Sequence, residues 1–193
     1  MRDAKIKNLL TQLLVLFNMK LIYTIIFYSF FITVVSGQSN YPSPKPSSIR
    51  LFYIQHSLSK NTYVYDVNLK DNELVNHNPI NVYRIMYEAH GQKANLSIPQ
   101  RKLAYGYSCE KISDTNYKFT LAAYKNQPMN LIKRNNKYVV ETIVNNRLMR
   151  LEKMFIQVKH DSNPLKFDVD YILFTGVDIK TGKPLTEKLF LDH

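Results

Sequence analysis

The chain has 193 residues, a formal net charge of +11 and a single cysteine. This length suits one domain, and a lone cysteine excludes an internal disulfide, so the hydrophobic core must stabilise the fold by itself. A basic chain is attracted to anionic partners such as lipid head groups, acidic glycans or nucleic acid. The basic residues are nevertheless dispersed, as on an ordinary solvated surface, and no pattern indicates specific nucleic-acid recognition.

The N-terminal part carries an apolar run at residues 21–35. The run is shorter than the roughly 20 residues that a membrane-spanning helix needs, but it suits the apolar core of a signal peptide. Val35-Ser36-Gly37 supplies compact residues for a cleavage site. We therefore expect residues 1–37 to be a cleaved signal peptide, with Met19 as an alternative start. The protein would then be exported, to the periplasm or the outside of the cell. The alternative is a retained anchor to which residues 9–17 contribute.

Residues 38–48 are rich in Pro and Ser, which is typical of an extended linker. The rest of the chain, residues 49–193, is expected to form a single β-rich domain. Residues 38–193 keep 22 of the 26 Lys and Arg and 14 of the 15 Asp and Glu, a net charge of +8. The mature protein is therefore expected to have a weakly basic surface and no transmembrane helix after signal cleavage.

Alternating apolar and polar residues predict strands along most of this domain. Asn pairs at 135–136 and 145–146 predict two tight hairpin turns, because Asn tolerates positive φ. About nine or ten strands with frequent turn signals predict a mainly β fold, a single antiparallel β-sandwich or barrel. The strand signals fall in eleven segments, some short enough to belong to one strand with a neighbour, at residues 51–54, 63–69, 80–87, 107–112, 117–123, 131–134, 137–144, 147–151, 154–158, 171–179 and 185–191.

One short helix is expected at residues 97–106. Ser97 fits its N-cap, and Gln100, three residues later, completes a capping box. Gly106 is expected to end the helix in the left-handed conformation. Two turns are unstable alone, so Leu103 is expected to be buried against the sheet.

This helix is also the predicted ligand platform. Gln100, Arg101 and Tyr105 could project from it, with Asn68 and Arg84 as further candidate ligand-binding residues. A guanidinium, amides and a phenol suit an anionic or sugar-like ligand or a component of the cell envelope. The alternative is that Arg101 is solvated and Tyr105 packs on the sheet.

The predicted function is a binding or envelope-associated module. The alternative is an envelope glycan hydrolase, which would need two carboxylates at a set distance, such as Asp66 and Glu88. No Gly-rich phosphate loop, zinc motif or nucleophile elbow is present, so no cofactor or metal is expected. The Asp-rich segment 161–170 could offer oxygen ligands to Ca²⁺, although such loops are usually solvated. Cys109 has no neighbouring base, which predicts a buried, inert thiol.

Several runs form a pattern that covers most of residues 49–191. The runs are Phe52-Tyr53-Ile54-Gln55, Asn61-Thr62, Tyr65-Asp66-Val67-Asn68, Asn78-Pro79-Ile80-Asn81-Val82-Tyr83, Gln100-Arg101-Lys102-Leu103-Ala104-Tyr105-Gly106, Thr175-Gly176-Val177-Asp178 and Thr181-Gly182. Together they resemble a family of exported bacterial domains of unknown function, although where members often have a tryptophan this chain has Tyr83. The family has no assigned activity, so the resemblance implies the domain boundaries and an exported setting, and no catalytic residue.

Overall fold

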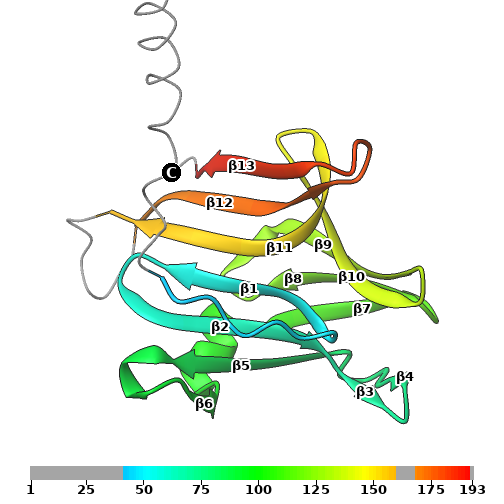
Figure 1. The fold of residues 1–193 in the computed structure, drawn as a ribbon, viewed down its shortest axis with the longest axis horizontal. Coiled ribbons are helices and arrows are strands. Elements are labelled where there is room, and N and C mark those ends of the chain that lie inside the picture. Colours follow the sequence, from blue (N-terminus) through cyan, green and yellow to red (C-terminus); the bar gives the residue numbers. More distant parts are fainter. Residues whose placement is uncertain (1–40, 160–167, 192–193) are drawn as a thin grey trace, which may run out of the picture. The chain divides into compact units, whose positions relative to one another are not determined.

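The computed structural model describes residues 41–159 and 168–191. From Pro42 onward the chain is one compact unit. Its main element is an 11-stranded sheet that curls into a half-barrel (Figure 1). The prediction of a mainly β fold is confirmed. The predicted signal peptide and most of the Asp-rich segment lie outside the described residues.

The strands are mostly short and follow one another closely along the chain, with two helical turns between them. β3 and β4 form a separate two-stranded hairpin. The elements are β1 (Arg50–His56), β2 (Ser59–Val67), β3 (Leu69–Lys70), β4 (Glu73–Leu74), β5 (Ile80–Met86), η1 (Tyr87–Ala89), β6 (Gln92–Asn95), η2 (Gln100–Ala104), β7 (Tyr107–Ser113), β8 (Asn116–Leu121), β9 (Tyr124–Arg134), β10 (Lys137–Val144), β11 (Arg147–Val158), β12 (Val169–Asp178) and β13 (Pro184–Phe190).

β11 joins the two parts of the large sheet. Along one edge its first residues pair with β10 and its later residues pair with β1, and its other edge pairs with β12. β1 and β11 run parallel, with Tyr53 opposite Lys153, whereas the other described strand pairs are antiparallel. The expected antiparallel sandwich or barrel is therefore corrected to one mixed, curled sheet. The parallel pair joins strands far apart in the sequence, so no hairpin signal announces it.

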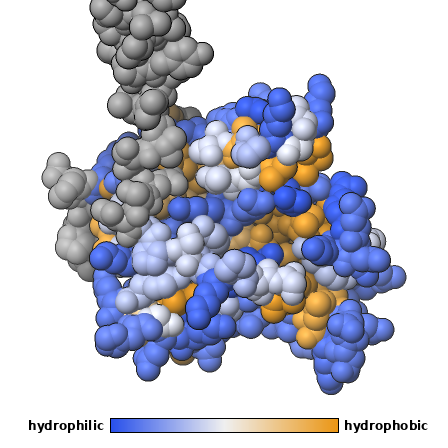
Figure 2. Space-filling view, in the orientation of Figure 1, coloured by the Kyte–Doolittle hydropathy of each residue, from blue (hydrophilic) through white to orange (hydrophobic). Residues whose placement is uncertain are grey.

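The core lies on the inner face of the curl. Phe52 of β1 stacks on Tyr65 of β2 at 4.3 Å between ring centroids, and it also lies 6.4 Å from Phe119 of β8. β1 and β8 are separated by β11, β10 and β9 in the sheet order, so this contact is possible only because the sheet curls. Hydrophilic residues cover much of the face shown in Figure 2, and apolar residues are visible toward its middle and right.

Both predicted Asn hairpins are confirmed. Asn135, Asn136, Asn145 and Asn146 all have positive φ, between 47° and 63°. They connect β9 to β10 and β10 to β11, whose registers continue up to the turns. The short amide side chain makes this left-handed backbone tolerable in a two-residue turn.

The proline-rich stretch lies on the domain for part of its length. Pro44 is buried, and the carbonyl oxygen of Pro42 accepts a hydrogen bond from Gln55 Nε2 at 2.8 Å. Gln55 is itself fully buried on the outer face of β1. The segment that the composition predicts as a linker therefore contributes contacts to the domain from Pro42 onward.

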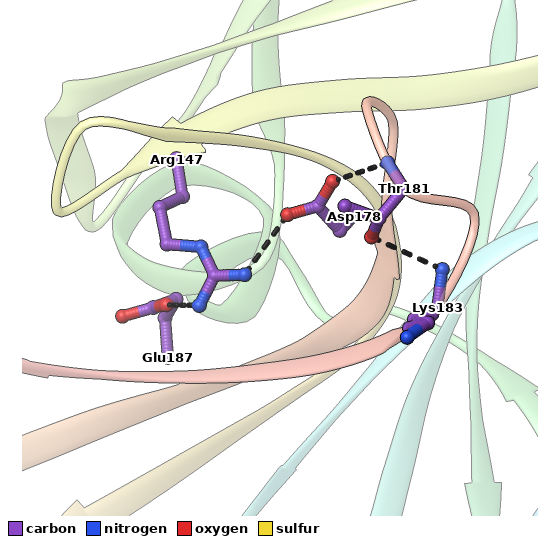
Figure 3. A network of polar contacts seen from close by, with 5 residues as sticks. All are labelled: Arg147, Asp178, Thr181, Lys183 and Glu187. Atoms are coloured by element: carbon purple, nitrogen blue, oxygen red, sulfur yellow. Dashed lines mark hydrogen bonds and ion pairs between the residues drawn. The ribbon is translucent and has the colours of Figure 1, made fainter.

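A polar cluster ties the β10–β11 turn to the last hairpin (Figure 3). The Arg147 guanidinium donates to Asp178 at 2.9 Å and to Glu187 at 3.0 Å. The other Asp178 oxygen accepts from the Thr181 backbone N–H at 2.8 Å. Arg147 and this N–H together lower the pKa of Asp178 to about 2. Each of these groups has a partner, so the cluster connects β11, β12 and β13 and stabilises the fold.

Candidate ligand-binding site

The helical turn expected at residues 97–106 is present in shortened form. The Ser97 N–H donates to Gln100 Oε1 at 3.0 Å, and the Gln100 N–H donates to Ser97 Oγ at 3.4 Å. These two bonds are the reciprocal pair of a capping box. The Tyr105 N–H then closes the turn on the Gln100 carbonyl at 2.7 Å. That i to i+5 bond makes η2 a π-turn, a form often found at functional sites.

Two expectations for this turn are wrong. Leu103 is 74 % exposed, and the buried anchor is instead Leu96, at 7 % exposure. The turn is wider than an α-helix, so its side chains point in other directions than those of the expected helix. Gly106 does not have positive φ. It is needed for another reason, because an added Cβ would lie 1.9 Å from the Arg101 carbonyl oxygen.

The turn is fastened to the sheet by a group of aromatic side chains, the tyrosine stack, made of His56, Tyr63 and Tyr105. The Tyr105 ring lies flat on Tyr63, and His56 lies 6.0 Å from Tyr63 and 6.4 Å from Tyr105 between centroids. Gln100 Nε2 lies 3.5 Å from the Tyr63 hydroxyl, and the Tyr65 hydroxyl donates to the Tyr105 carbonyl at 2.6 Å. Burial raises the pKa of Tyr63 and Tyr105 and lowers that of His56. These groups are therefore neutral near pH 7 and act as packing.

Arg84 and Asn68 are placed differently from each other. Arg84 is opposite Tyr63 in the β2–β5 register, so it shares the face on which the tyrosine stack sits. Its Nε is buried without a partner among the described residues. Asn68 Nδ2 instead donates to the Asn78 carbonyl at 2.8 Å, and the Asn68 N–H donates to the Pro79 carbonyl at 2.9 Å. Asn68 therefore holds the loop before β5.

Arg101 lines a polar cavity of about 290 Å³, the Arg101 pocket. The sheet order begins with β6 and ends with β7, and residues of both strands line the cavity, so it lies where the two ends of the half-barrel approach each other. Its polar wall contains amides, an imidazole, a phenol and a thiol beside the guanidinium, and no carboxylate occurs among its described lining residues. The lining residues are His77, Asn78, Ile80, Asn81, Val82, Asn95, Leu96, Arg101, Gly106, Tyr107 and Cys109.

Tyr107 of β7 lines the Arg101 pocket and contacts β5, near the other end of the sheet. Its hydroxyl accepts from the Ile80 N–H at 3.1 Å and lies 2.8 Å from Asn78 Oδ1. Burial raises the pKa of Tyr107 to about 12, and the nearby Arg101 charge acts in the opposite direction. The Arg101 charge therefore acts on the Tyr107 hydroxyl group. No described side chain accepts a hydrogen bond from the Arg101 guanidinium.

The thiol in the Arg101 pocket is placed differently from the expectation. Cys109 is exposed, so the predicted burial of this side chain is wrong. Partial burial by its neighbours still raises its pKa, and a thiol that is protonated near pH 7 is a weak nucleophile. Cys109 therefore contributes to the wall of the pocket and gives no sign of nucleophilic chemistry.

The two carboxylates considered for a hydrolase do not share a pocket. Asp66 is buried on the outer face of the sheet, where it is held by Arg50 and by the Tyr83 hydroxyl at 2.9 Å. It lines a separate cavity of about 590 Å³, and Glu88 is not among the residues of that wall. One Asp66 oxygen is paired with Arg50 and the other accepts a hydrogen bond from Tyr83, so both oxygens are engaged in contacts within the fold.

Residues 52–188 of the chain match a domain of unknown function, DUF4833. The chain belongs to the DUF4833 family. This confirms that the resemblance is to an uncharacterised family, and DUF4833 covers all strands that form the Arg101 pocket. No curated protein and no solved structure matches the chain. Among the described residues of this DUF4833 protein, no helix has the length and apolar character that crossing a bilayer requires.

The five predicted site residues thus have different places. Arg101 lines the pocket, Gln100 and Tyr105 fasten the turn beside it, and Asn68 holds a loop that forms its wall. Arg84 is opposite Tyr63 on the neighbouring strand. Their binding roles stay predictions. Sequence reasoning missed the loop before β5 and the first residues of β7. The Asn-Pro step before β5 was visible, but nothing local indicated that Asn78 meets a tyrosine 29 positions later.

Proposed function

We propose that this domain is a binding module that takes a small anionic or phosphorylated, sugar-like group in the Arg101 pocket. One observation carries the proposal: Arg101, whose guanidinium has no hydrogen-bond or ion-pair partner among the described residues, lines a cavity whose described lining contains no carboxylate. An anion entering the cavity meets a fixed positive charge and no fixed negative charge. Arg presents a planar fork that matches phosphate and carboxylate oxygens.

The amides around the cavity extend this recognition. Asn81 and Asn95 can donate to and accept from hydroxyl groups, which suits a sugar or a glycerol unit. The cavity is small, about 290 Å³, at the lower end of the range for small-molecule sites. The size favours one head group or one monosaccharide over a longer chain.

We also propose that the protein is exported and associated with the cell envelope. The support is the apolar run at residues 21–35 and the compact residues after it. The domain starts a few residues after the expected cleavage point, at Pro42. Intact-mass measurement of protein recovered from its native host tests this part, and a mass that includes residues 1–37 would show that the leader is retained.

Titration calorimetry of residues 38–193 with glycerol 3-phosphate, glucose 6-phosphate and galacturonate tests the pocket, with neutral glucose for comparison. We expect at least one anionic compound to bind, and Arg101→Gln to weaken binding at least tenfold, because the charged fork is lost. Lys102→Gln is the matched control: it removes an adjacent exposed charge that does not line the cavity, and binding should be unchanged. Failure of all the anions to bind, or equal binding by the Arg101 variant, would reject the proposal.

A further inference from the structure

The turn above the Arg101 pocket exposes two large aliphatic side chains. Leu103 is 74 % exposed and Ile98 is 70 % exposed, the two highest values among the large hydrophobic residues of the described chain. In the sequence, Ile98 precedes and Leu103 follows the pair Arg101 and Lys102, whose side chains are also exposed. Isolated apolar surface residues are common, but here two such residues flank two cations at the rim of a pocket.

These side chains are exposed in a turn that hydrogen bonds hold at both ends. Leu96 already fills the core position beneath it. The capping box fixes its first residues, and the Ala123 N–H donates to the Ala104 carbonyl at its other end at 3.1 Å. With both ends hydrogen-bonded, the backbone cannot rotate to bury Ile98 and Leu103 without breaking these contacts. The free protein therefore presents them to its surroundings permanently.

The stretch of chain that contains the turn carries charge of one sign. Residues 89–109, which include β6, η2 and the start of β7, contain Lys93, Arg101 and Lys102 and no Asp or Glu. Residues 38–193 as a whole carry a net charge of +8. Exposed aliphatic side chains with basic residues close by in the chain are complementary to the interface of an anionic bilayer. There, apolar side chains enter between the lipids and cations contact the phosphates. A stable protein partner would instead need about 800 Å² of matched surface on each side, more than two aliphatic side chains supply.

We propose that the 97–104 turn docks on an anionic phospholipid surface, with Ile98 and Leu103 in the interface and a lipid phosphate in the Arg101 pocket. This inference rests on the proposed function of the pocket and names the source of its anion. Arg101 of this turn and its flanking residues Leu96 and Gly106 line the pocket. A head group held there would therefore keep its acyl chains near the two aliphatic side chains.

The test is co-sedimentation of residues 38–193 with vesicles, since the chain from Pro42 onward forms a compact unit and the apolar leader is left out. Vesicles of phosphatidylcholine are compared with vesicles containing about 30 % phosphatidylglycerol, because anionic lipid supplies the attraction. We expect binding only to the anionic vesicles, and weaker binding as salt screens the charges. The double variant Ile98→Ser with Leu103→Ser should bind at least tenfold more weakly while its melting temperature stays the same.

Two controls separate this inference from the proposed function. Ile143→Ser removes an aliphatic side chain that is 59 % exposed elsewhere, on β10, and should leave vesicle binding unchanged. Glycerol 3-phosphate binding by the Ile98/Leu103 double variant should equal that of the wild type, because the pocket is intact. Soluble ligand binding without vesicle binding would overturn the lipid inference and leave the proposed function standing. Vesicle binding that does not respond to Arg101→Gln would overturn the placement of the head group in the pocket.

Discussion

Replacing Gly106 with Ala tests how the Arg101 pocket is built. An ideal Cβ at this position would lie 1.9 Å from the Arg101 carbonyl oxygen and 2.8 Å from its carbonyl carbon. Both obstacles are backbone atoms in a turn that is fastened at its two ends, so neither can move aside cheaply. Overpacking of this kind costs about 1–3 kcal/mol, and a backbone obstacle favours the upper end. Reduced freedom of the unfolded chain returns about 0.4–1 kcal/mol, which leaves a net loss of about 2–3 kcal/mol.

Thermal unfolding of residues 38–193 measures this loss. For a domain of this size, about 2–3 kcal/mol corresponds to a fall in melting temperature of roughly 4–12 °C. Gly91→Ala is the matched control, because no atom lies within 4 Å of its added Cβ and only its φ of +75° opposes the change. That strain costs about 1–2 kcal/mol. If Gly106→Ala melts no earlier than Gly91→Ala, the close approach to the Arg101 carbonyl is not a constraint and the reasoning fails.

Three further predictions address the core, a turn and a titrating group. Leu96→Ala should destabilise the protein by about 2–5 kcal/mol as a buried truncation, whereas Leu103→Ala should change stability by less than about 0.5 kcal/mol; equal losses in urea unfolding would contradict the burial. Asn146→Gly should be neutral or slightly stabilising, whereas Asn146→Val should cost about 1 kcal/mol or more, because β-branched residues resist positive φ; identical melting temperatures would place the turn elsewhere. Because the pKa of Asp178 in the fold is lowered to about 2, its stabilisation is present above about pH 4 and disappears as the pH falls toward 2. The difference in melting temperature between wild type and Arg147→Gln should therefore be constant near neutral pH and shrink over that acid range; a difference independent of pH would contradict the role of this ion pair.

Local signals in the sequence predicted the elements well where one residue decides the backbone. The two Asn pairs have the expected positive φ, and Ser97 with Gln100 forms the expected capping box. On β2, Tyr63, Tyr65 and Val67 face the main core as the alternation predicts. These features depend on neighbours within a few residues, so a single sequence contains the information.

The same kind of reasoning failed where contacts between distant residues decide. Leu103 was expected to be buried because a two-turn helix needs a packed anchor, but in the π-turn Leu103 is exposed and Leu96 is the buried residue. On β12 the core-facing residues are Ile172 and Phe174, although the alternating set that starts with Tyr171 is equally apolar in the sequence. Which face of a strand is buried depends on the register with its neighbours, which the strand itself does not encode.

By itself, the amino-acid sequence determined the mainly β class, the hairpin turns, the capped turn at residues 97–104 and the family. The tertiary structure alone decided the parallel pairing of β1 with β11, the curl of the sheet and the Arg101 pocket. The pocket exists because β5, β6, η2 and β7 meet at the two ends of one curled sheet. Its wall joins Asn78 and Tyr107 across 29 positions of the chain. Periodicity and capping act over a few residues, whereas the closing of the sheet depends on contacts such as that of Phe52 on β1 with Phe119 on β8, two strands far apart in the sequence.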